Sequence, residues 1–191
     1  YKSVSRAITI ASLEYKKVYI VGFSTGGLLA LLSTKKQYKE FVGLVCINAA
    51  LHLNDTRIKT LLPAISFWND IVSVFHEHEY AKEYIDNSPE NPEINYHKHY
   101  VDAIEQLSLL MKKTRKNLYK IKKPILIIQG KDDPIVNPSS AHEIYESIES
   151  RYKTLKIIEA SKHVIVIGEN TDELFEDILN FIQEGQDETA L

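Results

Sequence analysis

The sequence predicts an α/β protein in which helices flank a parallel β-sheet. Two observations favour this fold class. First, segments whose apolar residues have helical spacing separate most of the short apolar runs in the chain. Second, each run is apolar throughout, without alternating apolar and polar residues, which is typical of strands covered on both faces. Strands joined by single helices require right-handed crossovers, so their sheet is parallel. The expected strands are residues 17–22, 41–47, 124–129 and 154–159.

The helices are predicted from amphipathic spacing. The first covers residues 3–14 and places Val4, Ala7, Ile8 and Ala11 on one face. Further helices are expected at residues 25–36, 139–150 and 171–184.

A sharp turn with the pattern Gly22-x-Ser24-x-Gly26 follows the first strand and precedes the helix-prone residues 28–32. A strand, a tight turn carrying a serine and a helix together form a nucleophile elbow. Glycines suit this turn because neighbouring backbone approaches closely where no Cβ intervenes. The helix that begins near Thr25 directs its N–H groups and the positive end of its dipole at the position of an oxyanion. The Thr25 N–H is therefore a candidate oxyanion donor.

The partners that a nucleophilic serine needs follow two later strands. A serine hydroxyl requires a base, and that base requires a buried carboxylate. Asp132 and Asp133 follow the strand at 124–129, and His163 follows the next strand. The chain order is serine, acid and histidine, and the carboxyl ends of parallel strands meet at one edge of the sheet.

These motifs resemble the α/β-hydrolase superfamily, and within it the small bacterial carboxylesterases and monoacylglycerol lipases. Residues 22–27 match the elbow pattern Gly-x-Ser-x-Gly-Gly of these enzymes, and residues 130–136 match their acid-loop pattern Gly-x-x-Asp-x-x-Val. The second match selects Asp133 over Asp132. His163 precedes a hydrophobic run, as in the family, although Lys162 replaces the usual glycine before the histidine.

The resemblance also implies a domain organisation. Residues 1–50 and 119–191 form a partial α/β-hydrolase core, and residues 51–118 form an inserted helical cap. In this superfamily a cap lies over the nucleophile and shapes the acyl pocket. The candidate substrate-binding residues are Phe23, Phe67, Trp68 and Val164. Ordinary packing between helices explains most of the apolar residues of the cap, and the two explanations overlap because a cap needs its own small core.

Strands that normally precede the elbow are absent from this sequence. Only 23 residues precede Ser24, the chain opens with Tyr1, and its only methionine is Met111. About 70 residues of the usual fold are missing, including the loop that supplies a second oxyanion donor. We therefore expect a longer natural protein. Alone, this chain would expose an apolar sheet edge and self-associate.

Composition indicates a globular protein of ordinary charge. A net charge of −3 gives no reason to expect nucleic acid, and the seven basic residues within 112–123 fit a solvated surface. One cysteine, Cys46 in an apolar strand, means no internal disulfide and favours a cytoplasmic protein with a packed thiol. No apolar stretch reaches the ~18 residues of a membrane span.

The remaining histidines do not predict a metal site. His76 and His78, like His97 and His99, alternate along the chain, and neither pair has the i, i+4 spacing of a zinc-binding helix. No metal or other cofactor is expected. His52 is expected near the edge of the sheet that carries the elbow.

The sequence thus predicts a serine hydrolase acting on carboxylic esters with short to medium or monoacylglycerol-like acyl groups. Ser24 attacks the carbonyl to form an acyl-enzyme, His163 relays the proton and Asp133 orients His163. Thioesters, amides and lactones remain open as substrates. The alternative is a non-catalytic hydrolase-like module that serves binding or scaffolding.

Overall fold

The computed structural model of the chain describes residues 2–34, 38–55, 65, 69, 83–86, 98–168 and 171–187. Its main element is a four-stranded parallel sheet with the strand order β1-β2-β5-β6. The strands are β1 (Val18–Phe23), β2 (Phe41–Ile47), β5 (Ile125–Gly130) and β6 (Lys153–Ile158). Each begins and ends within one residue of its expected bounds, so the predicted fold class is confirmed.

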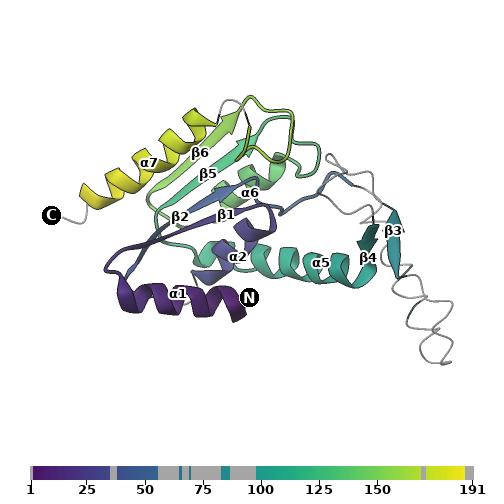
Figure 1. Cartoon of the computed structure of the whole chain (residues 1–191), viewed down its shortest axis with the longest axis horizontal. Helices are drawn as coiled ribbons and strands as arrows, with labels where there is room; N and C mark the ends of the chain where they lie inside the picture. Colours follow the sequence, from purple (N-terminus) through teal and green to yellow (C-terminus); the bar gives the residue numbers. More distant parts are fainter. Residues whose placement is uncertain are drawn as a thin grey trace. The chain divides into compact units, whose positions relative to one another are not determined.

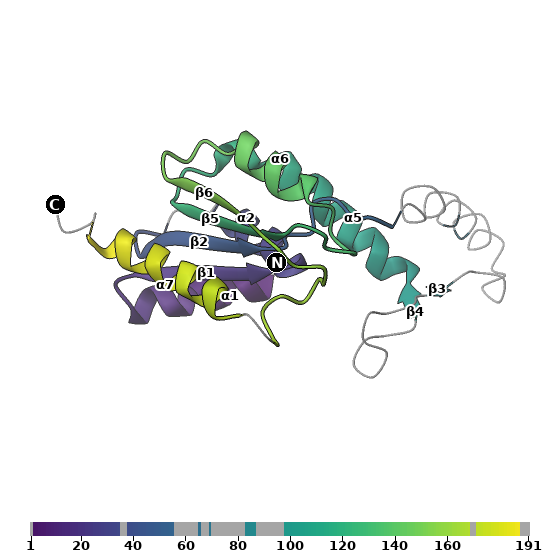
Figure 2. The ribbon, with the colours of Figure 1, turned by 90° about the horizontal axis from the view of Figure 1, so that it is seen from above.

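Helices cover both faces of this sheet (Figures 1 and 2). The helix α7 (Asp172–Asp187) lies on one face, and α1 (Lys2–Glu14) and α2 (Thr25–Ser33) lie on the other. A further helix, α6 (Ser139–Ser147), packs against β5 and β6. It ends before the expected residue 150 because Ile148 is already in an extended conformation.

Alternation along the strands divides the core into two layers. Val45 of β2 and Leu126 of β5 pack with Leu174 and Ile178 of α7 in one hydrophobic cluster. The neighbouring Cys46 points to the other face, where its Sγ lies 3.8 Å from the Gly27 carbonyl oxygen of α2. Cys46 is fully buried, so the predicted packed thiol is confirmed, and burial also raises the pKa of that thiol.

The two edge strands differ from the two central ones. Every residue of β5 is buried, whereas β1 and β6 contain several partly or fully exposed residues. The prediction that every strand is covered on both faces is therefore wrong for β1 and β6, because the helices cover these edge strands incompletely. Val21 of β1 is 51% exposed.

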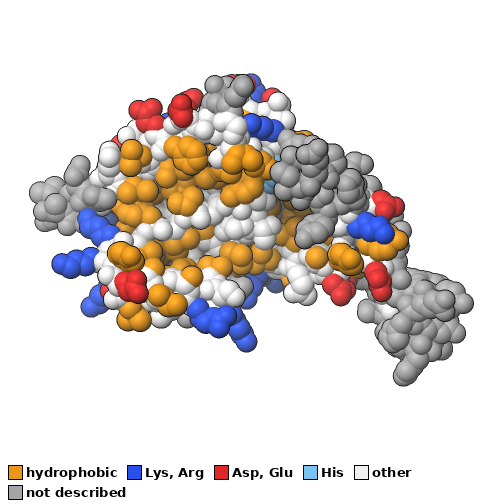
Figure 3. Space-filling model, in the orientation of Figure 1, with side chains coloured by type: hydrophobic (Ala, Val, Ile, Leu, Met, Phe, Trp, Pro, Cys, Tyr) orange, Lys and Arg blue, Asp and Glu red, His pale blue; other side chains and the backbone are white. Residues whose placement is uncertain are grey.

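Hydrophobic side chains gather on the face that has β1 in front (Figure 3). The elements around β1 contribute large exposed side chains, among them Ile10 and Leu13 of α1 and Phe175 and Leu179 of α7. Unpaired strand edges and apolar patches recruit other chains. Self-association through this edge stays a prediction.

Residues Asp55–Leu110 form a second compact unit, distinct from the first unit of Tyr1–Asn54 and Met111–Leu191. Its described part contains the antiparallel pair β3 (Tyr84–Asp86) and β4 (Lys98–Tyr100) and most of α5 (Val101–Arg115). Val101 and Ile104 form a small hydrophobic cluster with Ile65. Phe67 and Trp68, which the sequence assigns to the acyl pocket, lie outside the described residues.

Candidate active site

Ser24 occupies the turn between β1 and α2 with a positive φ of 53° and a ψ of −120°. A non-glycine residue with positive φ is uncommon and marks a turn that its surroundings hold in place. The backbone of the next strand provides that support. The Ser24 N–H donates to the Ile47 carbonyl at 2.9 Å, and the Ala50 N–H donates to the Ser24 carbonyl at 3.2 Å.

Two of the three elbow glycines are required by close contacts. A Cβ on Gly22 would lie 2.4 Å from the Gly26 carbonyl oxygen, and a Cβ on Gly27 would lie 2.7 Å from the Ala49 Cβ. Gly26 itself has open space at the corresponding position. The steric expectation therefore holds for Gly22 and Gly27 but is wrong for Gly26, because its Cβ position faces away from neighbouring atoms.

The predicted nucleophile, base and acid lie in one hydrogen-bonded chain. The His163 Nε2 is 2.9 Å from the Ser24 Oγ, and the His163 Nδ1 is 2.8 Å from the Asp133 Oδ2. The Asp133 side chain is fully buried, whereas Asp132 is exposed. The structure thus brings Asp133, and not Asp132, to the imidazole.

The acid loop fixes the Asp133 carboxylate from its other side. Its Oδ1 accepts the N–H of Ile135 at 2.8 Å and the N–H of Val136 at 2.9 Å. A carboxylate only accepts hydrogen bonds, so the proton of a neutral His163 lies on Nδ1, and Nε2 accepts the Ser24 hydroxyl. This is the tautomer in which an imidazole acts as a base toward serine.

The other predicted site residues have varied surroundings. Thr25 is the first residue of α2 and is exposed, and the first N–H groups of any helix have no partner within that helix. The Phe23 ring centroid lies 4.9 Å from that of His163, so Phe23 contacts the imidazole directly. Val164, which directly follows His163 in the chain, is half-buried.

Sequence reasoning missed two asparagines that bond the loops of the site. The Asn54 Nδ2 donates to the Asp133 carbonyl at 2.9 Å, and the Asn48 Nδ2 donates to the His163 carbonyl at 2.7 Å. Asn48 directly follows the apolar strand β2, as Asp133 and His163 follow β5 and β6. A polar residue just beyond a strand's carboxyl end was the signal that could have identified it.

His52 lies at this edge of the sheet, where its ring belongs to an ion-paired cluster. The His52 Nε2 is 2.5 Å from the Glu143 Oε2, and the Arg115 Nε donates to the Glu143 Oε1 at 2.6 Å. Burial favours a higher pKa for Glu143, but the hydrogen bonds from His52 and Arg115 and the Arg115 charge outweigh it and hold that pKa below its ordinary value. His142 is exposed on α6.

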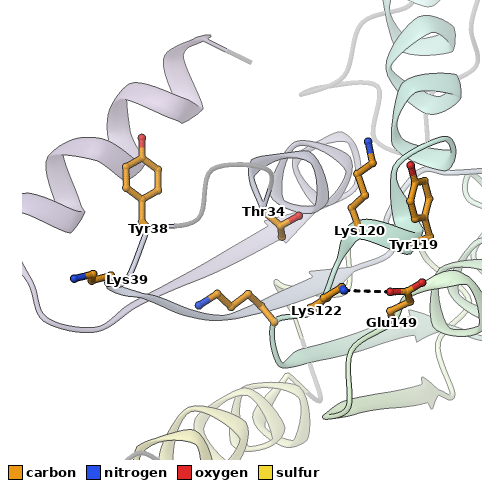
Figure 4. Close-up of a pocket in the computed structure, with 8 residues that line it drawn as sticks. Thr34, Tyr38, Lys39, Tyr119, Lys120, Lys122 and Glu149 are labelled. Atoms are coloured by element: carbon orange, nitrogen blue, oxygen red, sulfur yellow. Dashed lines mark ion pairs between the residues drawn. The ribbon is translucent and has the colours of Figure 1, made fainter.

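A hollow of about 1020 Å³ lies at the opposite edge of the sheet, beside the amino ends of the strands (Figure 4). Lys39 precedes β2 there, Lys122 precedes β5, and Lys122 pairs with Glu149 at 3.5 Å. The other lining residues are Thr34, Tyr38, Tyr119, Lys120 and Lys123. The basic residues near position 120 therefore line an open hollow that is separate from Ser24.

The described residues contain neither a metal-binding group nor a membrane-spanning helix. None of these residues forms a group of three or more His, Cys, Asp or Glu side chains able to hold a metal ion. His76, His78 and His97 lie outside this set. No helix in the described ranges is both long and apolar enough to span a membrane.

The profile of the family described as serine aminopeptidase, S33 (Hydrolase_4) matches residues 3–171. The chain belongs to this α/β-hydrolase family. Its sequence is 25% identical over 178 residues to a carboxylesterase of Bacillus subtilis (strain 168), covering 91% of this chain and 67% of that protein. It is 27% identical over 170 residues to a thermostable monoacylglycerol lipase of Bacillus sp. (strain H-257), covering 86% of this chain and 62% of that one. The predicted superfamily is confirmed.

Solved structures of the same superfamily share the fold. A structure from a study of the metagenome-derived lipolytic enzymes LipS and LipT superposes with a TM-score of 0.74 at 25% identity, covering 94% of this chain and 72% of the other. The monoacylglycerol lipase of Paleococcus ferrophilus gives a TM-score of 0.73 at 17% identity, covering 96% and 75%. This chain therefore spans 62% to 75% of the length of these related proteins.

Proposed function

We propose that this chain carries the catalytic residues of a serine hydrolase that cleaves carboxylic esters through an acyl-enzyme. The observation that supports the proposal most is the unbroken hydrogen-bonded chain from Asp133 through His163 to Ser24. Membership of a family of serine hydrolases supports the same reaction class.

Each residue of that chain takes one role. Ser24 Oγ attacks the ester carbonyl while His163 Nε2 takes its proton, and the buried Asp133 carboxylate stabilises the resulting imidazolium. The oxyanion accepts a hydrogen bond from the Thr25 N–H at the positive end of α2. His163 then returns the proton to the leaving alcohol. A water molecule, activated by the same imidazole, hydrolyses the acyl-enzyme and frees Ser24.

The proposed substrates are esters with short to medium acyl chains or monoacylglycerol-like esters. The two Bacillus relatives are named as a carboxylesterase and a monoacylglycerol lipase, which supports esters over peptides. Phe23 lies against His163 and provides an apolar surface at the reacting atoms. The cap of residues 51–118 and the substrate-binding roles of Phe67, Trp68 and Val164 stay predictions from the sequence.

The alternative, a non-catalytic binding module, accounts less well for the site. A binding surface has no need for a serine in a strained turn, an imidazole within 2.9 Å of it and a fully buried carboxylate behind that imidazole. Strained backbone and buried charge persist where the surroundings fix them, and such features cluster at active sites.

The test is hydrolysis of p-nitrophenyl esters by the natural protein, with acyl chains from acetyl to lauroyl, alongside a monoacylglycerol and an aminoacyl p-nitroanilide. We expect turnover of the esters that is abolished in the Ser24→Ala variant, with little or no turnover of the anilide. Equal turnover by the natural protein and by Ser24→Ala would contradict the proposal, as would an absence of ester turnover.

A further inference from the structure

Asn48 is a buried polar residue in an unusual backbone conformation. It directly follows β2, its exposed fraction is 0%, and its φ is 43°. Ser24 and Asn48 are the non-glycine residues with positive φ in the described part of the chain. Asparagine tolerates left-handed backbone better than most residues. Strain at a buried position persists only when the surrounding contacts hold it, so these contacts indicate what Asn48 does.

The side chain of Asn48 joins two loops of the candidate active site. Its Nδ2 donates to the His163 carbonyl at 2.7 Å, and its Oδ1 accepts the Gly130 N–H at 2.8 Å. A carbonyl can only accept and an N–H can only donate, so these partners fix which end of the amide carries oxygen. An amide suits this position because it is uncharged and carries both a donor for the His163 carbonyl and an acceptor for the Gly130 N–H.

The backbone around Asn48 reaches the third loop of the site. The Asn48 N–H donates to the Ile128 carbonyl at 2.9 Å. The preceding residue, Ile47, accepts the Ser24 N–H, and Ala50, two residues after Asn48, donates to the Ser24 carbonyl. Through Gly130 the amide also meets the start of the acid loop, because the Asp133 N–H donates to the Gly130 carbonyl at 3.4 Å. The loops of the nucleophile, the acid and the histidine thus all meet at Asn48.

We infer that Asn48 is a positioning residue whose amide sets where the His163 imidazole lies relative to Ser24 and Asp133. The inference rests on the proposed function. The bonded carbonyl belongs to His163 itself, so a shift at this contact moves the backbone from which the imidazole extends. A misplacement of about 1 Å at a reacting group costs on the order of 10²-fold in rate. We therefore expect the effect on kcat, because the fully buried Asn48 side chain has no surface to offer a substrate.

Two substitutions separate positioning from simple packing. Asn48→Gly removes both side-chain hydrogen bonds and tolerates the positive φ, so we expect kcat for ester hydrolysis to fall about 10- to 100-fold while KM stays within about threefold. Asn48→Asp keeps the shape and the acceptor for Gly130. When ionised, its second oxygen repels the His163 carbonyl, whereas its protonated form can donate to that carbonyl as the amide does.

The pH profile of Asn48→Asp provides a readout that a structural role would not change. The ratio of kcat in the variant to kcat in the natural protein removes the pH dependence of ester hydrolysis that the two proteins have in common. We expect this ratio to rise as the pH falls and the introduced carboxyl protonates. Ser140→Ala is the matched control. Ser140 is also buried and bonds the His52 backbone at 2.9 Å, so its loss should lower thermal stability without changing kcat or the pH profile.

The outcomes distinguish this inference from the proposed function. Suppose that the natural protein hydrolyses esters, but Asn48→Gly keeps full kcat or the kcat ratio of Asn48→Asp to natural protein does not depend on pH. Either result would overturn the role of Asn48 and leave the proposed function intact. Natural protein that hydrolyses no ester would overturn both. If Asn48→Gly fails to fold by circular dichroism, the nearly isosteric Asn48→Asp variant decides the question alone.

Discussion

The parallel sheet has a carboxyl edge, where its strands end, and an amino edge, where they begin. These two edges differ in how they hold their polar side chains. At the carboxyl edge, Asp133 and Asn48 are buried and each makes several hydrogen bonds to neighbouring loops. At the amino edge, lysines such as Lys39 and Lys122 line an open hollow, and the Lys122 ion pair with Glu149 is largely exposed. Both edges are rich in polar groups, but the buried Asp133 and Asn48 are held by several hydrogen bonds each, whereas Lys122 makes an exposed ion pair.

This difference indicates where chemistry is feasible. Holding a flexible side chain in one geometry costs conformational entropy, and exposed lysines lose little of their freedom on folding. A reacting group must instead be placed to within a fraction of an ångström. Substitutions at the carboxyl edge should therefore change rates strongly, and substitutions at the amino edge should change very little.

The largest expected effect is on the nucleophile and its base. Ser24→Ala or His163→Ala should reduce ester turnover by about 10⁴-fold or more, because the two residues act as a unit. His142→Ala is the control, since His142 is exposed on α6. Steady-state kinetics measure the effect. A similar loss in the control variant would show that the imidazole of His163 has no special role.

The next effect compares two adjacent acids. Asp133→Asn should reduce kcat by about 10³- to 10⁴-fold, because the imidazole loses the carboxylate that fixes its tautomer. Asp132→Asn should change kcat by less than about threefold, since Asp132 is exposed. The same ester assay distinguishes the two variants. A large loss in Asp132→Asn alone would reverse the assignment of the acid.

A smaller effect compares two glycines of the elbow. Gly27→Ala should lower the free energy of unfolding by about 1–3 kcal/mol, because its new Cβ would lie 2.7 Å from the Ala49 Cβ. Gly26→Ala has open space and should be neutral or stabilising by up to about 1 kcal/mol. Urea unfolding measures both. Equal destabilisation would show that close approach does not explain Gly27.

The ion-paired cluster around Glu143 predicts a pH dependence. Because the folded-state pKa of Glu143 lies below its ordinary value of 4.5, its contribution to stability is complete above that value and is lost as the pH falls through the folded-state pKa. Glu143→Gln should cost at most about 1 kcal/mol at neutral pH, since the group is partly exposed.

Thermal unfolding as a function of pH measures this contribution. The stability of Glu143→Gln should approach that of the natural protein as the pH falls below 4.5 and through the lower folded-state pKa of the natural carboxyl. A difference between the two proteins that grows in acid would contradict the assigned direction of the pKa.

The smallest effect is expected at the amino edge. Lys39→Gln and Lys122→Gln should each change the free energy of unfolding by less than about 0.5 kcal/mol and leave ester turnover unchanged. Denaturant unfolding and the ester assay check both statements. A loss of turnover in either variant would break the distinction between the two edges.

The sequence predicted those parts of the fold and site that local pattern determines. Apolar runs defined the four strands, and the order of Ser24, Asp133 and His163 along those strands placed them at one edge. Choosing Asp133 over Asp132 required the spacing to Gly130 and Val136, and the structure places Asp133 against the imidazole.

Features that depend on tertiary contacts were not predicted. The bond from Asn48 to His163 joins residues 115 positions apart, and no local pattern encodes such a pairing. The room at Gly26 and the exposure of Val21 likewise follow from which atoms pack nearby. These properties arise from the assembled sheet and its helices and not from any single segment.

The central claim is that the residues of the carboxyl edge activate Ser24 as a nucleophile. Treatment of the natural protein with an alkyl fluorophosphonate, followed by peptide mass spectrometry, tests it most directly, because this reagent reacts with an activated serine. We predict stoichiometric labelling on Ser24 that is strongly slowed in His163→Ala. Labelling of another serine, or unlabelled Ser24 in folded protein, would contradict the claim.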